Sequence, residues 1–344
     1  MTDFYSFGLG IGTQNKQQQW LDIFYSAPLL KPSPAIVNAI KTSLTYTEGN
    51  ATIDVTPTQM SELANELANA GETEQSALAN MLSTSEQPLV VTLLASDAAP
   101  SSVPEGYLKL HLLSHRLVKP HGTDLSGLFG ILPNVAWTNQ GAVDITELPQ
   151  RQLAARLKGE LLTVDCVDKF PKMTNYVVPS GVRIAHTARV RLGAHIGEGT
   201  TIMHEGFVNF NAGTLGTSMV EGRISAGVVV GEGSDLGGGS STMGTLSGGG
   251  NIVISIGKES LLGANAGVGI PIGDRCIVES GLYITAGTKV NLLADSGELV
   301  EVIKARDLAG KADLLFRRNS LSGAIECLSN QSSVALNEAL HANN

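Results

Sequence analysis

The sequence is poor in aromatic residues and in cysteine, and both shortages limit the classes of protein it can belong to. Aromatic residues make up 5% of the 344 residues, too few for a core built mainly around large rings. The three cysteines, Cys166, Cys276 and Cys327, lie far apart and are odd in number. A disulfide-stabilised secreted domain is denser in cysteine, so we expect reduced thiols in a cytoplasmic protein.

Long apolar runs and an excess of basic residues are also absent. No stretch is long enough to cross a bilayer, and the start MTDFYSFGLGIGTQNK lacks the basic and apolar regions of a secretory signal. Lys and Arg number 23 against 32 Asp and Glu, which gives a net charge of −9. Such an acidic chain is not expected to bind nucleic acid nonspecifically, so we predict neither a nucleic acid nor a membrane as a partner.

What the sequence does contain is an aliphatic residue at every sixth position over much of residues 178–290. A period of six fits neither a helix nor a simple alternating strand, and it indicates a hexapeptide β-helix, a solenoid of short parallel strands. The next residue is often small, as in Ile196-Gly197, because glycine adopts the backbone angles of a corner. The periodic residues are Val178, Ile184, Val190, Ile196, Ile202, Val208, Ile224, Val230, Leu236, Ile256, Leu262, Val268, Ile272, Val278, Ile284 and Val290.

A glycine-rich sandwich or a linker is the alternative to a solenoid. A linker would not keep aliphatic residues in phase over so many steps, and a core of stacked single side chains needs few aromatic residues. Two segments, Thr214–Gly222 and Thr242–Ser255, interrupt the period, and insertions in a solenoid project as loops from one face. The glycine-rich tract 231–250 has neither a phosphate-loop nor a dinucleotide motif, so solenoid turns and a loop explain it better.

We therefore predict a mixed α/β N-terminal domain over residues 1–110 and a connecting region over 111–177. A β-helix catalytic domain follows over 178–290, and a short C-terminal segment over 291–344. The local predictions are a helix over Pro57–Leu82, a buried strand over Pro88–Ala95, a helix over Thr146–Lys158 capped by Thr146, a basic loop or strand over Leu308–Leu321 and a short helix over Val334–His341. Tyr107–Val118 can be a strand or a helix, and we favour a strand followed by a turn.

Four stretches are more specific than the period: FPKMTNYVVPSGVRIA, MHEGFVNFNAGTLG, SMVEGRISAGVVVG and LLFRRNSLSGA. Together they resemble the tetrahydrodipicolinate N-succinyltransferases, in particular the longer branch found in actinobacteria and pseudomonads. The match covers about Asp165 to the C-terminus, and the N-terminal domain fits by length only. The resemblance implies a homotrimer of left-handed β-helices. It also implies transfer of succinyl from succinyl-CoA to the amine of ring-opened tetrahydrodipicolinate, in the diaminopimelate route to lysine.

The resemblance also implies a catalytic residue. Glu221 in MVEGR matches the carboxylate that this family is described as using, through an acyl-anhydride intermediate. A carboxylate can attack a thioester, or it can take the proton from the attacking amine as a general base, and the sequence leaves both roles open. The alternative is a charged loop residue without a role, but its place just before the period resumes at Ile224 favours a site.

A set of succinyl-CoA contacts follows from the same resemblance. Small residues let backbone or hydroxyl groups approach the ligand, and arginine offers planar donors to the phosphates of CoA. A solvated basic turn is the alternative for the two adjacent arginines, but on an acidic chain we favour a ligand contact. The implied contacts are Arg223, Gly238, Ser241, Ala264, Glu279, Ser280, Gly287, Lys304, Arg317, Arg318, Asn319 and Ser320.

A metal is a further implication of the resemblance. Glu205 in MHEGF matches a position that can hold Mg²⁺ on the trimer axis of relatives, and oxygen ligands suit this hard cation. The partner aspartate of those relatives is replaced here by Ala188, so a purely structural carboxylate is the alternative. We expect a packing or hydrogen-bonding role for the adjacent His204.

Two rival functions remain open from the residues. One is a hexapeptide acyltransferase that uses acetyl-CoA, which donor preference would distinguish. The other is a zinc enzyme resembling the γ-carbonic anhydrases, which needs histidine ligands on neighbouring coils. Among His186, His195 and His204, only the first and the last are a full 18-residue coil apart, so this spacing argues against the zinc site.

Overall fold

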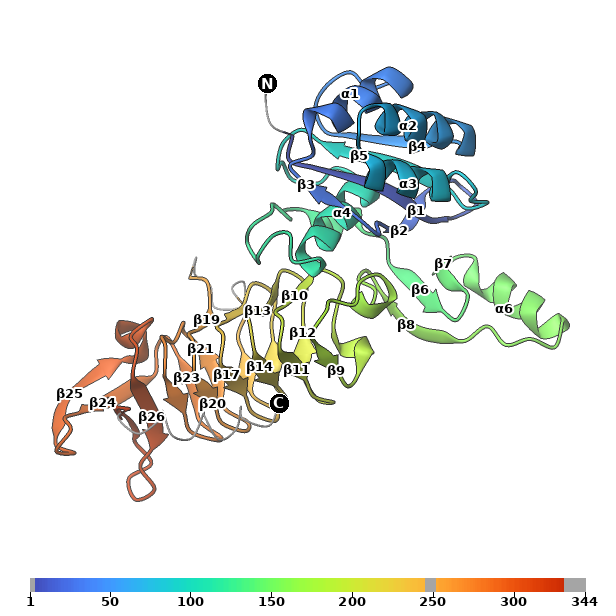
Figure 1. The fold of residues 1–344 in the computed structure, drawn as a ribbon. Helices are drawn as coiled ribbons and strands as arrows, with labels where there is room; N and C mark the ends of the chain where they lie inside the picture. Colours follow the sequence, from blue (N-terminus) through green and yellow to red (C-terminus); the bar gives the residue numbers. More distant parts are fainter. Residues whose placement is uncertain (1–3, 245–251, 331–344) are drawn as a thin grey trace. The chain divides into compact units, whose positions relative to one another are not determined.

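The computed structural model describes residues 4–244 and 252–330, which fall into two compact units (Figure 1). The first unit comprises residues 1–112, 122–171 and 175–177, and the second comprises residues 113–121, 172–174 and 178–344. The short helix predicted at Val334–His341 lies outside the described residues. No helix within the described ranges is long and apolar enough to cross a membrane.

An antiparallel five-stranded sheet forms the centre of the first unit. The strand order is β2-β1-β5-β4, and β3 pairs with β1. The predicted buried strand is confirmed as β5, which is buried along its whole length. The strands are β1 (Ser6–Gln14), β2 (Trp20–Phe24), β3 (Leu29–Leu30), β4 (Ala51–Val55) and β5 (Leu89–Leu94).

Three helices cover one face of this sheet: α1 (Pro34–Ser43), α2 (Pro57–Asn69) and α3 (Thr73–Leu82) (Figure 1). Their apolar sides and the inward residues of β1, β4 and β5 form one core. The helix predicted over Pro57–Leu82 is confirmed but divided in two. The break falls at Gly71, whose φ of +82° belongs to the left-handed region that favours glycine.

The opposite face is covered by α4 (Val103–Ser114), where the sequence prediction was wrong. We expected a strand and a turn over Tyr107–Val118, but the chain is helical as far as Ser114. The helix has no exposed polar face, because the residues from 107 to 113 are all buried, Lys109 and His111 included. A helix that is buried all round shows no amphipathic period. It packs close to β1 at Gly8, where an added Cβ would lie 2.9 Å from the side chain of Leu108.

A second, three-stranded sheet completes the first unit. Its strands β6 (Val135–Thr138), β7 (Gly141–Asp144) and β8 (Val164–Asp168) pair in the order β7-β6-β8, with short helix α5 (Leu128–Ile131) before them. The predicted helix at Thr146–Lys158 is confirmed as α6 (Leu148–Leu157), but its predicted cap is wrong. Glu147 occupies the cap position, and the Thr146 hydroxyl instead donates to the carboxylate of Asp144.

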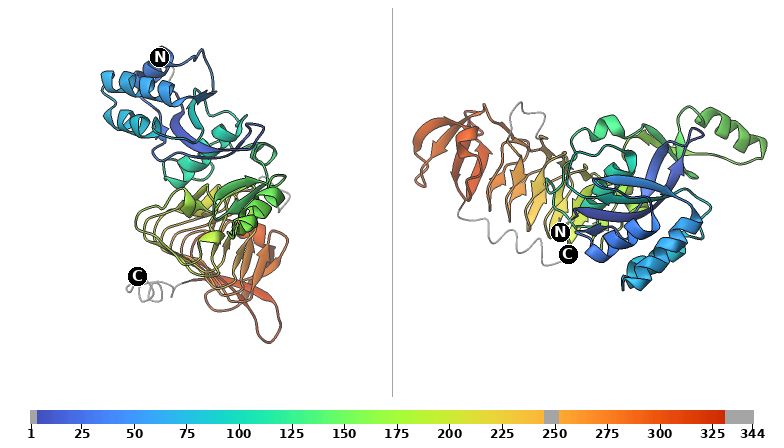
Figure 2. Two further views of the ribbon diagram at one scale, coloured as in Figure 1. Left: turned by 90° about the vertical axis from the view of Figure 1, so that its right-hand side faces the viewer. Right: turned by 90° about the horizontal axis from the view of Figure 1, so that it is seen from above.

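The second unit is a parallel β-helix of three sheets, and its stacked coils can be followed in both views of Figure 2. The first sheet contains β10 (Ala194–Ile196), β13 (Ala212–Thr214), β16 (Val229–Val230) and β19 (Ser255–Ile256). The second contains β9 (Arg183–Ile184), β11 (Thr200–Ile202), β14 (Ser218–Val220), β17 (Ser234–Leu236), β20 (Leu261–Leu262), β22 (Ile277–Val278) and β26 (Leu314–Arg318). The third contains β12 (Phe207–Val208), β15 (Arg223–Ile224), β18 (Ser241–Thr242), β21 (Gly267–Gly269) and β23 (Tyr283–Thr285).

The strand register explains the two interruptions of the period. Thr214 and Val220 both point inward and are fully buried, so the predicted insertion at Thr214–Gly222 is wrong. That coil is regular but two residues short, because Val220 pairs with Leu236. The second interruption is a true insertion, since Val230 pairs with Ile256, 26 positions on, which is eight more than the 18 of a regular coil.

Two hairpins end the β-helix, and short segments support its start. Strands β24 (Lys289–Leu293) and β25 (Leu299–Lys304) form one antiparallel pair, and β26 and β27 (Ile325–Ser329) form the other. The basic segment predicted over Leu308–Leu321 therefore contains a strand.

Residues 113–121 bond to the first sheet, for example through the Arg116 guanidinium, which donates to the Ile196 carbonyl. Three 3-10 helices are η1 (Met173–Asn175), η2 (Thr187–Arg189) and η3 (Ala305–Leu308).

Each inward residue supports the coils on both sides, so one truncation should weaken the whole stack. Leu262 is fully buried between Leu236 and Val278, whereas Leu299 on β25 is 56% exposed. We expect Leu262→Ala to lower the free energy of unfolding by about 2–5 kcal/mol, because it leaves a cavity. The matched control Leu299→Ala should change it by less than about 0.5 kcal/mol. Urea unfolding followed by far-UV circular dichroism measures both, and equal effects would contradict the stacked core.

Candidate active site

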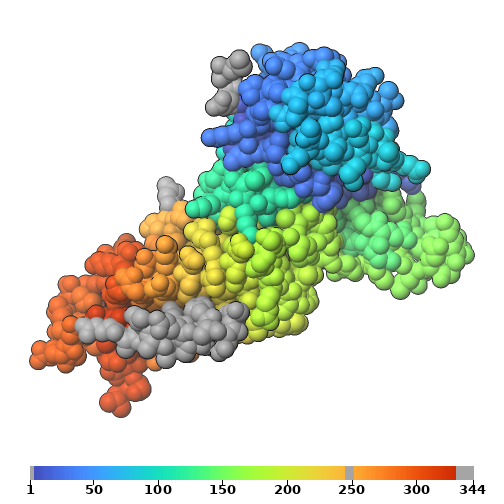
Figure 3. Space-filling model, in the orientation of Figure 1, coloured from blue at the N-terminus to red at the C-terminus, as the bar shows by residue number. Residues whose placement is uncertain are grey.

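The corners that join the second sheet to the third stack along one edge of the β-helix. We call this series, residues 203–206, 221–222, 237–240, 263–266 and 279–282, the edge column. Backbone hydrogen bonds tie each corner to the next: Gly239 N–H to Glu221 O at 3.3 Å, Asn265 N–H to Gly238 O at 2.9 Å, and Gly281 N–H to Ala264 O at 2.8 Å. The space-filling view shows the coils of this unit as successive bands of colour from green to orange (Figure 3).

The edge column brings together residues that lie far apart in the sequence. Glu221, Gly238, Ala264 and Ser280 occupy consecutive corners, which is where four of the predicted site residues meet. The three residues beside Glu221 in this set are small. An added Cβ on Gly238 would lie 3.3 Å from Oε2 of Glu221, so glycine leaves room beside the carboxylate.

Glu221 itself lies at the shortened corner between β14 and β15. Its backbone N–H donates to the carbonyl of Leu236 at 2.8 Å, which fixes the corner on the coil above. The side chain is half-buried, and within the described ranges its carboxylate makes no hydrogen bond or ion pair. A carboxylate held by its backbone and left without a partner can act either as a nucleophile or as a base.

A row of outward residues on the third sheet begins next to Glu221. Arg223 pairs with Ser241, Ser241 with Gly267, and Gly267 with Tyr283 along the sheet. The Tyr283 ring lies over Gly267, where an added Cβ would be 2.2 Å from the ring. Arg223 is exposed, so this row offers a cation, a hydroxyl and an aromatic ring to a ligand. Sequence reasoning missed Tyr283, since only the register places it in this row.

The hairpin β26–β27 carries the predicted Arg317-Arg318-Asn319-Ser320 segment. Arg317 Nε donates to Oε2 of Glu326 at 3.0 Å, and Asn319 Nδ2 donates to Oε1 of the same carboxylate at 2.8 Å. Both hydrogen bonds lower the pKa of Glu326, and the bond from Asn319 has the larger effect. Glu326 is 7% exposed and was missed from the sequence, where nothing marks it before the hairpin register pairs it with Arg317.

Glu279 connects the edge column to this hairpin. Its Oε2 accepts a hydrogen bond of 2.6 Å from the backbone N–H of Arg318. Since its carboxylate is engaged in this way, Glu279 holds the hairpin against the last corner. Arg318 extends its guanidinium to the carbonyl of Gly323 at 3.1 Å, and Ser320 is exposed in the turn.

Two predicted contacts lie outside the edge column, the row that starts at Arg223 and the hairpin β26–β27. Gly287 follows β23 at the corner that leaves the third sheet, and it is exposed with open space around its Cα. Lys304 ends β25 opposite Lys289, so two lysines stand side by side on that hairpin. The two lysines add positive charge at this end of the β-helix. Both they and Gly287 are separate from the corner that holds Glu221.

The residues around Glu205 do not fit a metal site. Its two carboxylate oxygens are both engaged, Oε1 with Nδ1 of His204 and Oε2 with Arg189, each at 2.8 Å. Both partners lower the pKa of Glu205, and the hydrogen bond with His204 has the larger effect. Ala188 supplies no oxygen ligand, and no group of three potential ligands occurs among the described residues. A cation there would compete with Arg189, so we assign no chemistry to magnesium.

The three histidines of the rival zinc enzyme do not converge. His186 and His204 lie one coil apart with ring centroids 5.1 Å apart, as the 18-residue spacing predicted. His195 is on the first sheet, where it is 6% exposed and its Nδ1 lies 3.0 Å from the carbonyl of Val118. Burial is the main cause that lowers the pKa of His195. This arrangement does not support a three-histidine metal site.

A parallel β-helix with a free carboxylate on a corner, small neighbours and two adjacent arginines on its last hairpin has the features of a hexapeptide-repeat acyltransferase. Two family models match the chain, "Tetrahydrodipicolinate N-succinyltransferase middle" over residues 132–172 and "Hexapeptide repeat of succinyl-transferase" over residues 253–286. The chain belongs to the tetrahydrodipicolinate N-succinyltransferase family, as its relatives show.

Full-length relatives establish this membership. The chain is 67% identical to a 2,3,4,5-tetrahydropyridine-2,6-dicarboxylate N-succinyltransferase of Pseudomonas aeruginosa, over 99% of this chain and 98% of the relative. It is 61% identical to that of Vibrio cholerae, over 99% of both chains. A Campylobacter jejuni crystal structure, described as a 2,3,4,5-tetrahydropyridine-2-carboxylate N-succinyltransferase, is 32% identical with a TM-score of 0.89 over 97% of this chain and 94% of its own. The similarity thus includes the N-terminal unit, which the sequence motifs had not reached.

Glu326 should hold the hairpin in the shape that presents the arginines. We expect Glu326→Ala to increase amide hydrogen exchange over residues 314–329, because Arg317 and Asn319 both lose their acceptor. The exchange of residues 200–208 should stay unchanged and serves as the internal control. Because the pKa of Glu326 is lowered on folding, its stabilisation is present above the normal carboxyl pKa and is lost as the pH falls through the folded value. Unchanged exchange in the hairpin would contradict this role.

Proposed function

We propose that this protein transfers the succinyl group of succinyl-CoA to the amine of ring-opened tetrahydrodipicolinate. The product is N-succinyl-2-amino-6-oxopimelate, an intermediate of diaminopimelate and lysine biosynthesis. The observation that carries the proposal is the 61–67% identity over almost the whole chain to proteins named for this activity. The position of Glu221 on the edge column supports it.

The reaction is an acyl transfer from sulfur to nitrogen. The amine nitrogen attacks the thioester carbonyl, the carbon–nitrogen bond forms, and the carbon–sulfur bond breaks. The amine loses one proton, and the leaving thiolate gains one to become free CoA. Glu221 either accepts the amine proton or first takes the succinyl group as a mixed anhydride, which the amine then opens. Both routes need a carboxylate without a hydrogen-bond or ion-pair partner. The carboxylate of Glu221 has none among the described residues.

The remaining site residues are proposed to bind succinyl-CoA. Gly238, Ser241, Ala264 and Ser280 are small, which leaves space along the corners for an extended acyl-thioester. Arg223 and Lys304, with Arg317 and Arg318, offer positive charge to the CoA phosphates, and bidentate donation favours arginine there. The succinyl-CoA contacts proposed are Arg223, Gly238, Ser241, Ala264, Glu279, Ser280, Gly287, Lys304, Arg317, Arg318, Asn319 and Ser320.

The assembly is part of the same proposal. We infer a homotrimer of left-handed β-helices, in which a site lies between neighbouring subunits. The flat outer faces of three sheets support packing of copies against one another. The cytoplasmic location and the domain boundaries at 110, 177 and 290 likewise remain proposals.

Release of free CoA thiol tests the function directly. Purified protein is mixed with tetrahydrodipicolinate, or its analogue 2-aminopimelate, and is given succinyl-CoA or acetyl-CoA in turn. We expect release with succinyl-CoA that depends on the amine acceptor. Release with acetyl-CoA alone would keep the fold and move the assignment to the acetyl-transferring rival. No release with either donor would overturn the proposal.

Glu221→Gln tests the catalytic carboxylate, because it keeps the shape of the side chain and removes its charge. We expect turnover to fall at least about 1,000-fold, while binding of CoA by calorimetry stays within about twofold. The control Glu232→Gln replaces an exposed glutamate on a corner outside the edge column and should leave turnover unchanged. Near-normal turnover in Glu221→Gln would remove Glu221 from the mechanism.

A further inference from the structure

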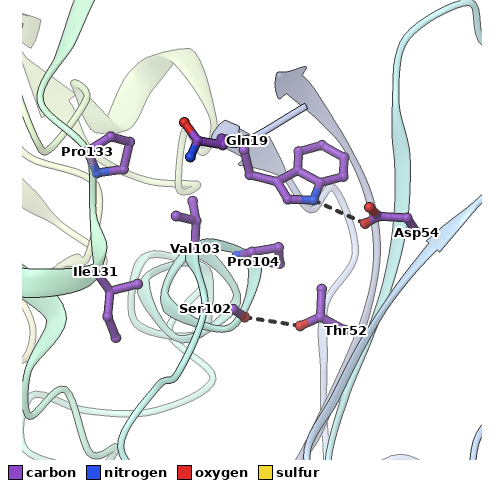
Figure 4. Close-up of a pocket in the computed structure, with 9 residues that line it drawn as sticks. Gln19, Thr52, Asp54, Ser102, Val103, Pro104, Ile131 and Pro133 are labelled. Carbon is purple, nitrogen blue, oxygen red and sulfur yellow. Dashed lines mark hydrogen bonds between the residues drawn. The ribbon is translucent and has the colours of Figure 1, made fainter. Parts of the chain in front are cut away.

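The first unit contains a pocket formed by its own residues (Figure 4). Its volume is about 560 Å³, within the range of about 300–1,000 Å³ that is usual for small-molecule sites. The pocket is lined by the start of β2, by β4, by the start of α4 and by the end of α5 with Pro133 after it. None of the catalytic or CoA-binding residues proposed above belongs to it, so it is a separate feature of the molecule.

One end of the pocket is polar and carries a single charged side chain. Asp54 of β4 accepts a hydrogen bond at Oδ1 from Nε1 of Trp20, at 3.1 Å. The hydroxyls of Thr52 and Ser102 bond to each other at 3.1 Å beside it. The second carboxylate oxygen of Asp54 has no partner within the described part of the chain, and no Lys, Arg or His lines the pocket. This end therefore offers negative charge and hydrogen-bond acceptors.

The other end of the pocket is apolar. Ile131 and Pro133 lie on the side away from Asp54 and Thr52, and Val103 lies between the two ends (Figure 4). The edge of the Trp20 indole is next to the carboxylate, since its Nε1–H donates to Asp54. A ligand that fits both ends is positively charged at one end and aliphatic at the other.

We propose that this pocket binds a small primary ammonium compound with a short aliphatic body. The ammonium group bonds to the free oxygen of Asp54 and lies beside the Trp20 ring. The aliphatic part contacts Val103, Ile131 and Pro133. Anionic ligands, including CoA and dicarboxylates, are disfavoured because the pocket holds a carboxylate and no basic side chain. The site thus differs in ligand class from the donor site on the β-helix.

Calorimetric titration of the full chain with n-pentylamine at neutral pH tests this proposal. We expect saturable binding with one site per chain. The neutral isostere n-pentanol and the anion pentanoate should each bind at least about threefold more weakly, because the ion pair with the exposed carboxylate of Asp54 is lost. This comparison needs no variant. No saturable binding of n-pentylamine, or equal affinity for n-pentanol, would overturn the proposal.

Asp54→Asn locates the site, since it keeps the acceptor for Trp20 and removes the charge. We expect it to weaken n-pentylamine binding at least about threefold, because the ion pair is lost, with circular dichroism unchanged. The matched control Glu62→Gln removes an exposed charge on α2 outside the pocket and should leave binding unchanged. Succinyl-CoA-dependent thiol release should continue in Asp54→Asn, so this test is independent of the proposed transferase activity. Equal binding by Asp54→Asn and the parent chain would place the amine elsewhere.

Discussion

The structure of the second unit depends on one repeated constraint, the stacking of each inward side chain on its equivalent in the next coil. Ile184, Ile202 and Val220 are in register on the second sheet, and each is joined to its neighbours by parallel backbone hydrogen bonds. Neighbouring strands in such a sheet are about 4.8 Å apart. Because the spacing is fixed at every coil, a residue placed on one corner is held at a fixed distance from the corners above and below it.

The candidate active site follows from this spacing. A corner residue needs no supporting loop, since the coil below and the coil above determine its backbone. The shortened corner at Glu221 brings the carboxylate directly before β15, and the glycines of the next corner leave the space beside it open. The last coil adds a different kind of support, in which Glu279 and Glu326 use their carboxylates to hold the basic hairpin. Acidic residues thus position the arginines that we propose to bind an anionic donor.

The failed predictions have local physical causes. The α4 helix was expected as a strand because it is buried all round, which removes the amphipathic period that identifies a helix. Thr146 was expected as the cap, but the helix begins one residue later than that, and the Thr146 hydroxyl donates to Asp144 instead. Thr214 was overlooked as an inward residue because it is polar, although its hydroxyl bonds within the coil to Thr200. Burial decided the first case, and hydrogen bonds to Asp144 and to Thr200 decided the other two.

The sequence by itself determined the β-helix, because a six-residue period has one simple structural solution. It also indicated the family and the candidate residues, because short motifs such as MVEGR remain recognisable without coordinates. Only the tertiary structure decided which residues meet. Strand register and packing set three such contacts. The Tyr283 ring lies over Gly267, Glu326 accepts hydrogen bonds from Arg317 and Asn319, and Asp54 accepts one from Trp20. Tyr283 follows Gly267 by one 16-residue coil, which the periodic neighbours Val268 and Ile284 mark in the sequence. The contacts of Glu326 and Asp54 join positions whose separation follows no period, so no pattern in the sequence could have revealed them.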